Sequence, residues 1–156
     1  IKPDSGMKQA YSIISKIFRL APKSSKTSIS EAISFTQNIL KRKSVVILIS
    51  DFLDKNYEPN LKALARKHDL VVLHIYDNRE ISLPALGIIP VFDKESGEMR
   101  WINSSSTTFK KELSLNFNQS KAKLEKLCIQ NKAKYLAIES GADYVANLIQ
   151  LFRIRK

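Results

Sequence analysis

The sequence has 156 residues, of which 44% are hydrophobic and 26% charged, and this is typical of a globular protein large enough to bury a core. Its apolar runs are shorter than the roughly 18 residues that a membrane-spanning helix needs, and we expect no signal peptide. The formal net charge of +11 predicts an anionic partner, which can be nucleic acid, an anionic membrane or an acidic protein.

The first third of the chain predicts two helices followed by a strand. Apolar residues at helical spacing predict one helix over 6–20 and a second over 29–41. The second begins with a capping box formed by Ser28 and Glu31, so it does not require the hydroxyl of the preceding Thr27. The unbroken apolar run over 45–49 predicts a strand over 45–50 that is covered on both faces.

The rest of the chain predicts an α/β fold. Glu58 and Pro59 begin a short helix, and a second buried strand over 70–76 completes a parallel crossover. Two extended segments around an acidic turn at 93–97 predict a β-hairpin over 88–103, laid on the edge or the rim of the sheet. A long helix to residue 132, irregular around 116–120, a third strand over 134–139 and a last helix follow. We therefore predict a three-layer architecture with a mostly parallel sheet and helices on both faces.

Polar residues at the carboxyl ends of two strands are the main candidates for a functional site. Ser50 and Asp51 follow the first strand, and Asp77 follows the second, where open α/β sheets bind ligands. Thr27 and Asp51 offer a hydroxyl and a carboxylate to a hard cation such as Mg²⁺. The alternative is that Asp51 is a turn residue or a helix cap, and position alone does not decide between the two.

Several enzyme motifs are absent from the sequence. It has no glycine-rich phosphate loop, no paired cysteines for zinc and no nucleophile elbow, which argues against a nucleotide-dependent or zinc enzyme. We expect a protein that is not an enzyme. His68 and Asp69 are explained by a turn before a strand, and His74 by packing inside one. The single cysteine, Cys128, lies among apolar residues and indicates a reducing compartment, so we expect the protein to be cytoplasmic.

A run of short motifs in one order resembles a known family. The run consists of Lys26-Thr27 with Ala32, Leu48-Ile49-Ser50-Asp51-Phe52, His68-Asp69, Leu83-Pro84 with Gly87, and Asp93 with Glu95, Gly97 and Glu98. It is similar to the C-terminal part of the bacterial domain-of-unknown-function family 58, whose members carry a von Willebrand factor A-like domain. The resemblance implies a doubly wound sheet and a metal-ion-dependent adhesion site made by a D-x-S-x-S loop, a threonine and an aspartate. Thr27 matches the threonine and Asp51 the aspartate, but no D-x-S-x-S loop occurs in this sequence.

The resemblance implies that residues 1–156 are a single, truncated von Willebrand A-like domain. In the full-length domain, Mg²⁺ would take its last ligand from an acidic residue of a partner, with Ser50, Phe52 and Asp77 as partner-binding residues. We expect Mg²⁺ to be absent or weakly bound without the first loop. The implied partner is a MoxR-type AAA+ ATPase, in assembly or chaperone-like work. The edge of strand 45–50 would lack its neighbour, which predicts a homodimer or a retained partner fragment.

Two alternatives of other classes stay open. A basic nucleic-acid-binding domain would need exposed aromatic residues beside its cations, whereas we expect most of the aromatic residues to lie in the core. These are Phe18, Phe35, Tyr76, Phe109, Phe117 and Phe152. A metal-dependent hydrolase would use Asp51 and Asp77 at neighbouring strand ends.

Overall fold

A computed structural model describes residues 1–21, 27–92 and 97–153. Its centre is a parallel sheet in the order β1 (Val45–Ser50), β2 (Asp69–Tyr76) and β5 (Lys134–Glu139). Val45 pairs with Asp69 at one end of β1 and Ser50 pairs with His74 at the other, so the first two strands end at one edge. The predicted parallel crossover is therefore confirmed.

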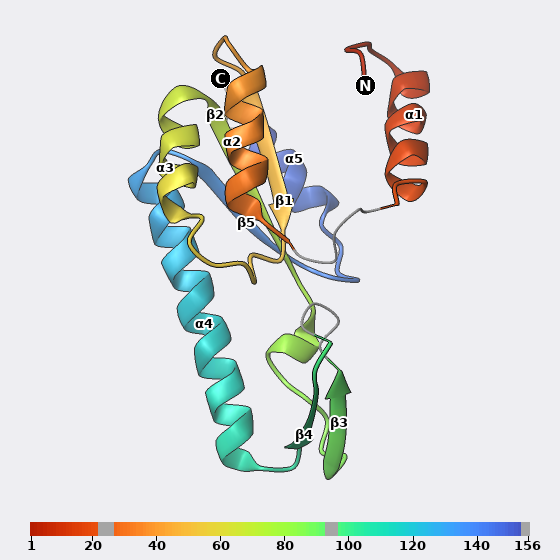
Figure 1. The fold of residues 1–156 in the computed structure, drawn as a ribbon, viewed down its shortest axis with the longest axis vertical. Helices are drawn as coiled ribbons and strands as arrows, with labels where there is room; N and C mark the ends of the chain where they lie inside the picture. Colours follow the sequence, from red (N-terminus) through yellow and green to blue (C-terminus); the bar gives the residue numbers. More distant parts are fainter. Residues whose placement is uncertain (22–26, 93–96, 154–156) are drawn as a thin grey trace.

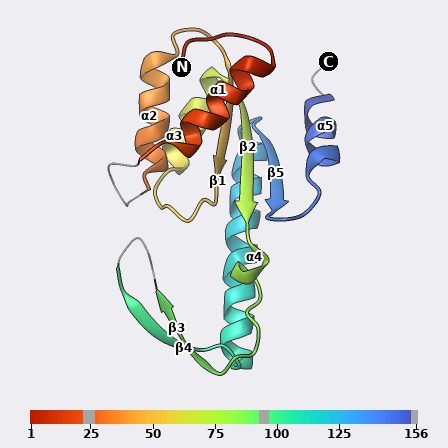
Figure 2. The same cartoon turned by 90° about the vertical axis from the view of Figure 1, so that its right-hand side faces the viewer.

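Helices pack against both faces of this sheet (Figures 1 and 2). One face carries α2 (Ile29–Ile39), α3 (Glu58–Lys67) and α4 (Thr107–Gln130), whose apolar side chains form one core with Leu70 and Val72 of β2. On the other face, α5 (Val145–Arg153) packs on Val71 and Leu73 of β2 and on Ile138 of β5. The central strand is thus buried from Leu70 to His74 because helices cover both of its faces.

The expectation that strand 45–50 is covered on both faces is wrong. Val46 and Leu48 of β1 contact the core under α2 and α3. On the opposite face, Val45, Ile47 and Ile49 keep 50%, 47% and 62% of their surface exposed. The reason is that α5 packs over β2 and β5, and not over β1. An unbroken apolar run predicts the strand, but it does not predict whether a helix packs on each of its faces.

The first predicted helix exists, but its apolar stripe is not part of the core. Helix α1 (Met7–Phe18) has no buried residue, and Phe18 is 87% exposed. Figure 1 shows α1 standing apart from the sheet, on the side that carries α5. Residues 22–26 of the following loop, including Lys26, lie outside the described residues.

The predicted hairpin is confirmed as β3 (Ile88–Phe92) paired antiparallel with β4 (Met99–Asn103). It forms a two-stranded sheet of its own beside the N-terminal end of α4, beyond the parallel sheet (Figure 1), and so it does not lie on the edge of that sheet. Its base is closed by Ser104, which is fully buried and bonds Gly87 O through both its amide and its hydroxyl, at 2.8 and 2.9 Å. Residues 93–96 of the expected turn lie outside the described residues.

Two further expectations need correction. Helix α4 is continuous from Thr107 to Gln130, with no break at 116–120. Phe35 on α2 is 67% exposed, so the aromatic residues are less buried than the sequence predicts. By contrast, the predicted N-cap at Ser28 is confirmed, because Ser28 Oγ accepts a hydrogen bond from the Glu31 amide at 3.3 Å, which is one of the two hydrogen bonds of a capping box. None of the helices in the described part of the chain is long and apolar enough to cross a lipid bilayer.

Candidate functional site

The candidate site lies at the carboxyl end of β1, in the loop that leads to α3. Asp51 follows the strand directly, and its Oδ1 accepts hydrogen bonds from the Leu53 amide at 3.3 Å and the Ser50 hydroxyl at 3.4 Å. Ser50 Oγ also accepts a bond from the Phe52 amide at 3.1 Å. Asp51 is therefore a turn residue, as one interpretation of the sequence proposed, and its side chain is exposed at the rim of the loop.

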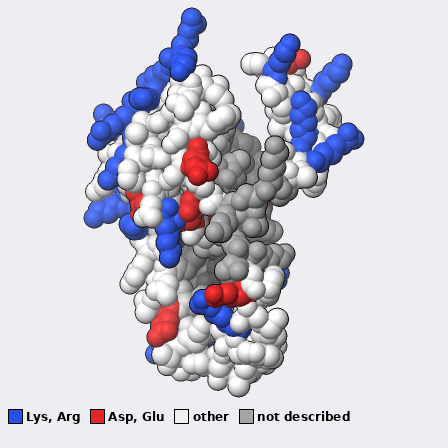
Figure 3. All heavy atoms as spheres, viewed as in Figure 1, with Lys and Arg blue, Asp and Glu red and all other residues white. Residues whose placement is uncertain are grey.

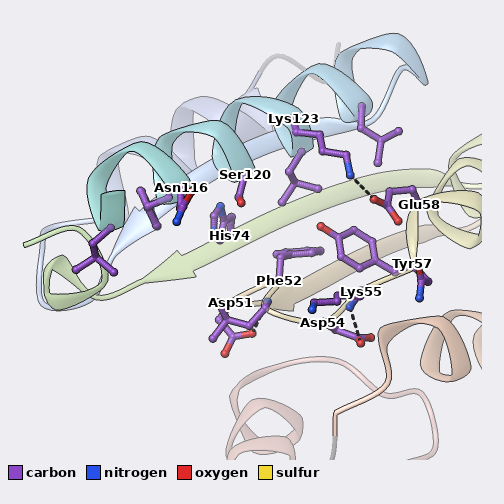
Figure 4. A pocket seen from close by; sticks show the side chains of 16 residues that line it. Asp51, Phe52, Asp54, Lys55, Tyr57, Glu58, His74, Asn116, Ser120 and Lys123 are labelled. Atoms are coloured by element: carbon purple, nitrogen blue, oxygen red, sulfur yellow. Dashed lines mark hydrogen bonds and ion pairs between the residues drawn. The ribbon is translucent and has the colours of Figure 1, made fainter. Parts of the chain in front are cut away.

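Phe52 turns inward from this loop and holds it against the sheet. Its φ of 56° is in the left-handed region, which costs a residue with a side chain roughly 1 kcal/mol or more. Burial of the ring offsets this cost, since only 8% of Phe52 is exposed. The ring makes edge contacts with Tyr57 and His74, with centroids 5.5 and 5.6 Å away (Figure 4).

His74 lies in the central strand, β2, and contacts Phe52 after the end of β1 on one side and Tyr135 of β5 on the other. It is 4% exposed, and its Nδ1 lies 2.8 Å from the Tyr135 hydroxyl. Burial lowers the pKa of His74, while a hydrogen bond with the Asp51 backbone acts in the opposite direction. Burial also raises the pKa of the Tyr135 hydroxyl. The pair is therefore neutral, and His74 packs in the core as the sequence predicts.

A cavity of about 590 Å³ opens between the loop over residues 51–58 and helix α4 (Figure 4). Its apolar wall includes Phe52, Tyr57 and Phe117, and polar side chains of α4 border it. Burial raises the pKa of Tyr57 to about 12, so its phenol stays protonated. An apolar wall with a few polar groups is typical of a binding pocket.

An ion pair links the two sides of the cavity. Lys123 Nζ of α4 lies 2.7 Å from Glu58 Oε1 at the start of α3. The hydrogen bond from Lys123 lowers the pKa of the Glu58 carboxyl below its usual value. Both side chains line the cavity, so the pair holds α3 and α4 together at its border.

Asp54 joins this loop to the start of α2, a role that the sequence analysis missed. Its Oδ2 accepts a hydrogen bond from the Ile29 amide at 2.7 Å, and its Oδ1 accepts one from the Lys55 amide, also at 2.7 Å. Ser30 Oγ adds a bond to the Asn56 carbonyl at 3.1 Å. These contacts fix the segment that carries Thr27 beside the end of β1. A local sequence pattern cannot predict this hydrogen bond, because the two residues are 25 positions apart in the chain.

The other predicted site residues occupy separate positions. Asp51 and Phe52 line the cavity, whereas Thr27, Ser50 and Asp77 are not among its lining residues. Asp77 follows β2, accepts a hydrogen bond from the Arg79 amide at 2.8 Å and pairs with the Arg79 side chain at 3.5 Å. The strand ends thus place Asp51 and Asp77 at one edge of the sheet, as predicted, but only Asp51 borders the cavity.

The described side chains do not fit a magnesium site by themselves. Mg²⁺ requires near-octahedral oxygen ligands, usually with one or two carboxylates. Asp54 uses both of its oxygens for backbone amides, and Asp51 already accepts two hydrogen bonds. Across residues 1–21, 27–92 and 97–153, no three acidic, histidine or cysteine side chains form a group that could hold a metal. Thr27 and Asp51 could supply only part of such a site.

The sheet and its polar carboxyl edge define an open α/β protein with a parallel sheet. The family model "Protein of unknown function DUF58" matches residues 1–123, and the chain belongs to this family. The family named by the resemblance is thereby confirmed. The chain is 23% identical over 141 residues to "Uncharacterized protein MAV169" of Mycobacterium avium, and the match covers 87% of this chain and 80% of that protein. It is 23% identical over 137 residues to "Uncharacterized protein Rv1480" of Mycobacterium tuberculosis, covering 87% of this chain but 43% of the relative. No solved structure matches.

Proposed function

We propose that this chain is part of a von Willebrand A-like, non-enzymatic protein-binding module, which works in the cytoplasm. The observation that carries the proposal is the cavity beside Asp51. It combines an apolar wall, made by Phe52 and Tyr57 among others, with an exposed carboxylate at its border. Such a pocket can take an apolar side chain of a partner while polar groups at the rim fix its orientation.

The position of the cavity supports this proposal. It lies at the carboxyl end of a parallel strand, the edge at which open α/β sheets bind ligands. The loop that forms it is held by Phe52 from inside and by Asp54 from the start of α2. A site held in this way loses little conformational freedom when a partner binds.

The longer protein would add a metal to this edge. We propose that Thr27 and Asp51 contribute to a Mg²⁺ site whose remaining ligands lie outside the present chain. The partner would be a MoxR-type AAA+ ATPase, and the role would be in assembly or in chaperone-like work. The unpaired edge of β1 is the surface for a further strand or for a homodimer, because β1 pairs with β2 alone among the described strands.

The test is the affinity of the full-length protein for the MoxR-type ATPase of the same organism, measured by calorimetry in Mg²⁺ and in EDTA. Ser120→Trp places a large side chain at the border of the cavity, and we expect it to weaken binding at least about tenfold. Gln119→Trp adds the same side chain one residue away on α4, outside the cavity, and is the matched control.

Asp51→Ala tests the metal separately from the cavity. We expect it to weaken binding in Mg²⁺ and to make no further difference in EDTA, with Asp4→Ala as an exposed control of equal charge. Full-strength binding by Ser120→Trp would show that the partner does not use the cavity. Equal affinity of the wild type in Mg²⁺ and EDTA would refute the metal dependence.

A further inference from the structure

The opposite edge of the sheet gathers positive charge. In a parallel sheet, the segments that enter the strands all lie at one end, and here each of the three segments carries cations. The basic amino edge consists of Lys41, Arg42 and Lys43 before β1, Arg66 and Lys67 before β2, and Lys132 before β5. All six side chains are exposed. Figure 3 shows blue side chains running along the upper left of the molecule, over α3 and the turn above β1.

Part of this edge is hollowed. A depression of about 510 Å³ is lined by Lys43, Arg66 and Lys132, one cation from each entering segment. The amides of Gln130 and Asn131 lie in the same lining, together with His68 and the carboxylate of Asp69. Three positive groups therefore surround a polar hollow that contains one carboxylate.

None of the six cations is in an ion pair within the described part of the chain. Its ion pairs join Arg79 with Asp77, Arg100 with Glu98 and Lys123 with Glu58, all away from this edge. Arg66 and Lys67 lie in the last turn of α3, where the helix dipole accounts for part of their placement. Lys43 and Lys132 likewise follow the C-terminal ends of α2 and α4, so helix dipoles favour cations in all three segments. The dipoles do not require that one cation from each segment line the same hollow.

Lys132 adopts a left-handed backbone conformation, which glycine or asparagine would adopt at a lower energetic cost than lysine does. Its φ is 58°, in the left-handed region that glycine or asparagine usually occupies after a helix. The helix ends there because the Ala133 amide bonds the Cys128 carbonyl at 2.9 Å, which does not depend on the side chain of Lys132. The lysine at this position is thus not explained by helix termination.

We propose that the basic amino edge binds an acidic segment of a protein partner, with aspartate or glutamate carboxylates in the hollow. A nucleic acid is a poorer fit, because no Phe, Tyr or Trp side chain lines the hollow for a base to stack on, and the one ring there, that of His68, is buried and accepts a hydrogen bond from the Ser44 amide at 3.3 Å. The surface is at the other end of the sheet from the cavity beside Asp51, so this binding does not rest on the function proposed above.

The test uses three probes at low and at physiological salt: an acidic peptide of six Glu-Ser repeats, a 12-nucleotide single strand and the corresponding DNA duplex. The variant Lys43→Gln/Arg66→Gln/Lys132→Asn removes three charges from the hollow, and asparagine suits the left-handed backbone at 132. The control Lys8→Gln/Lys16→Gln/Arg19→Gln removes the same charge from exposed residues on and next to α1. Arg66→Gln alone serves if the triple variant does not fold.

We expect the peptide to bind wild type, and the affinity to fall about tenfold in the hollow variant and by less than about threefold in the control. Binding should also weaken as salt increases, because these charges are exposed. Equal losses in the two triple variants would show attraction by net charge alone and overturn the proposal. Tighter binding of either nucleic acid than of the peptide, lost in the hollow variant, would overturn it in favour of nucleic acid. Absence of peptide binding at low salt would overturn it as well.

Discussion

Replacing Phe52 with alanine tests whether one aromatic side chain holds the loop after β1. The ring is 8% exposed and contacts the rings of Tyr57 and His74. Truncating a buried phenylalanine to alanine costs about 3–5 kcal/mol, and the lower end applies where little new void forms. Because Phe52 already borders the cavity, we expect the free energy of unfolding to fall by about 3 kcal/mol.

Urea denaturation followed by circular dichroism measures this difference. Phe35→Ala is the matched control, because it removes the same ring from an α2 position that is 67% exposed, and we expect a change within about 0.5 kcal/mol. The variant should remain folded if the protein has an ordinary stability of about 5–15 kcal/mol. A loss below about 1 kcal/mol, or equal losses in both variants, would show that Phe52 does not anchor the loop.

Three further predictions concern the same region and the core beneath it. Asp54→Asn should lower the free energy of unfolding by about 1–2 kcal/mol, since the buried Ile29 loses a charged acceptor for its amide. Asp143 accepts a hydrogen bond from the Val145 amide at an exposed position, so in urea titrations Asp143→Asn should lower the free energy of unfolding by less than Asp54→Asn does. Because burial lowers the pKa of His74 below its ordinary value of 6.5, stability should be constant above about pH 6.5 and decrease as the pH falls below it. Denaturation at several pH values should show that decrease in His68→Gln but not in His74→Gln. Finally, burial raises the pKa of the Cys128 thiol to about 12, so iodoacetamide at pH 8 should label it only after urea unfolds the chain; labelling of the native protein would contradict its burial.

Local patterns in the sequence were sufficient to predict most of the elements. The apolar runs over 45–50 and 70–76 became neighbouring strands, and the Ser28–Glu31 spacing located the start of α2. The two extended segments around 93–97 became the hairpin. Each of these signals depends on residues close together in the chain, where spacing reports geometry directly.

Long-range packing explains what the sequence could not predict. The exposed face of β1 and the exposed stripe of α1 are as apolar as core elements. Only the fold shows that they are left uncovered, because α5 packs over β2 and β5 and α1 stands apart from the sheet (Figure 1). The cavity is formed by a loop and by α4, which are separated in the sequence by α3, β2 and the hairpin. Asp51 and Thr27 were proposed as site residues from their place at strand and helix ends, whereas the hydrogen bond between Asp54 and Ile29 could be seen only in the fold.

The parallel direction of the strands separates the two candidate surfaces. Each strand begins at the basic amino edge and ends at the edge that carries Asp51, and β1 has six residues. At about 3.3 Å per residue the two edges are roughly 20 Å apart, which exceeds the Debye length of about 8 Å at physiological salt. Neutralising Lys43, Arg66 and Lys132 should therefore leave binding at the cavity unchanged, and Ser120→Trp should leave binding of the acidic peptide unchanged. If one partner engages both edges, the free-energy losses of the two variants should add, because no contact or strong field couples sites at this separation.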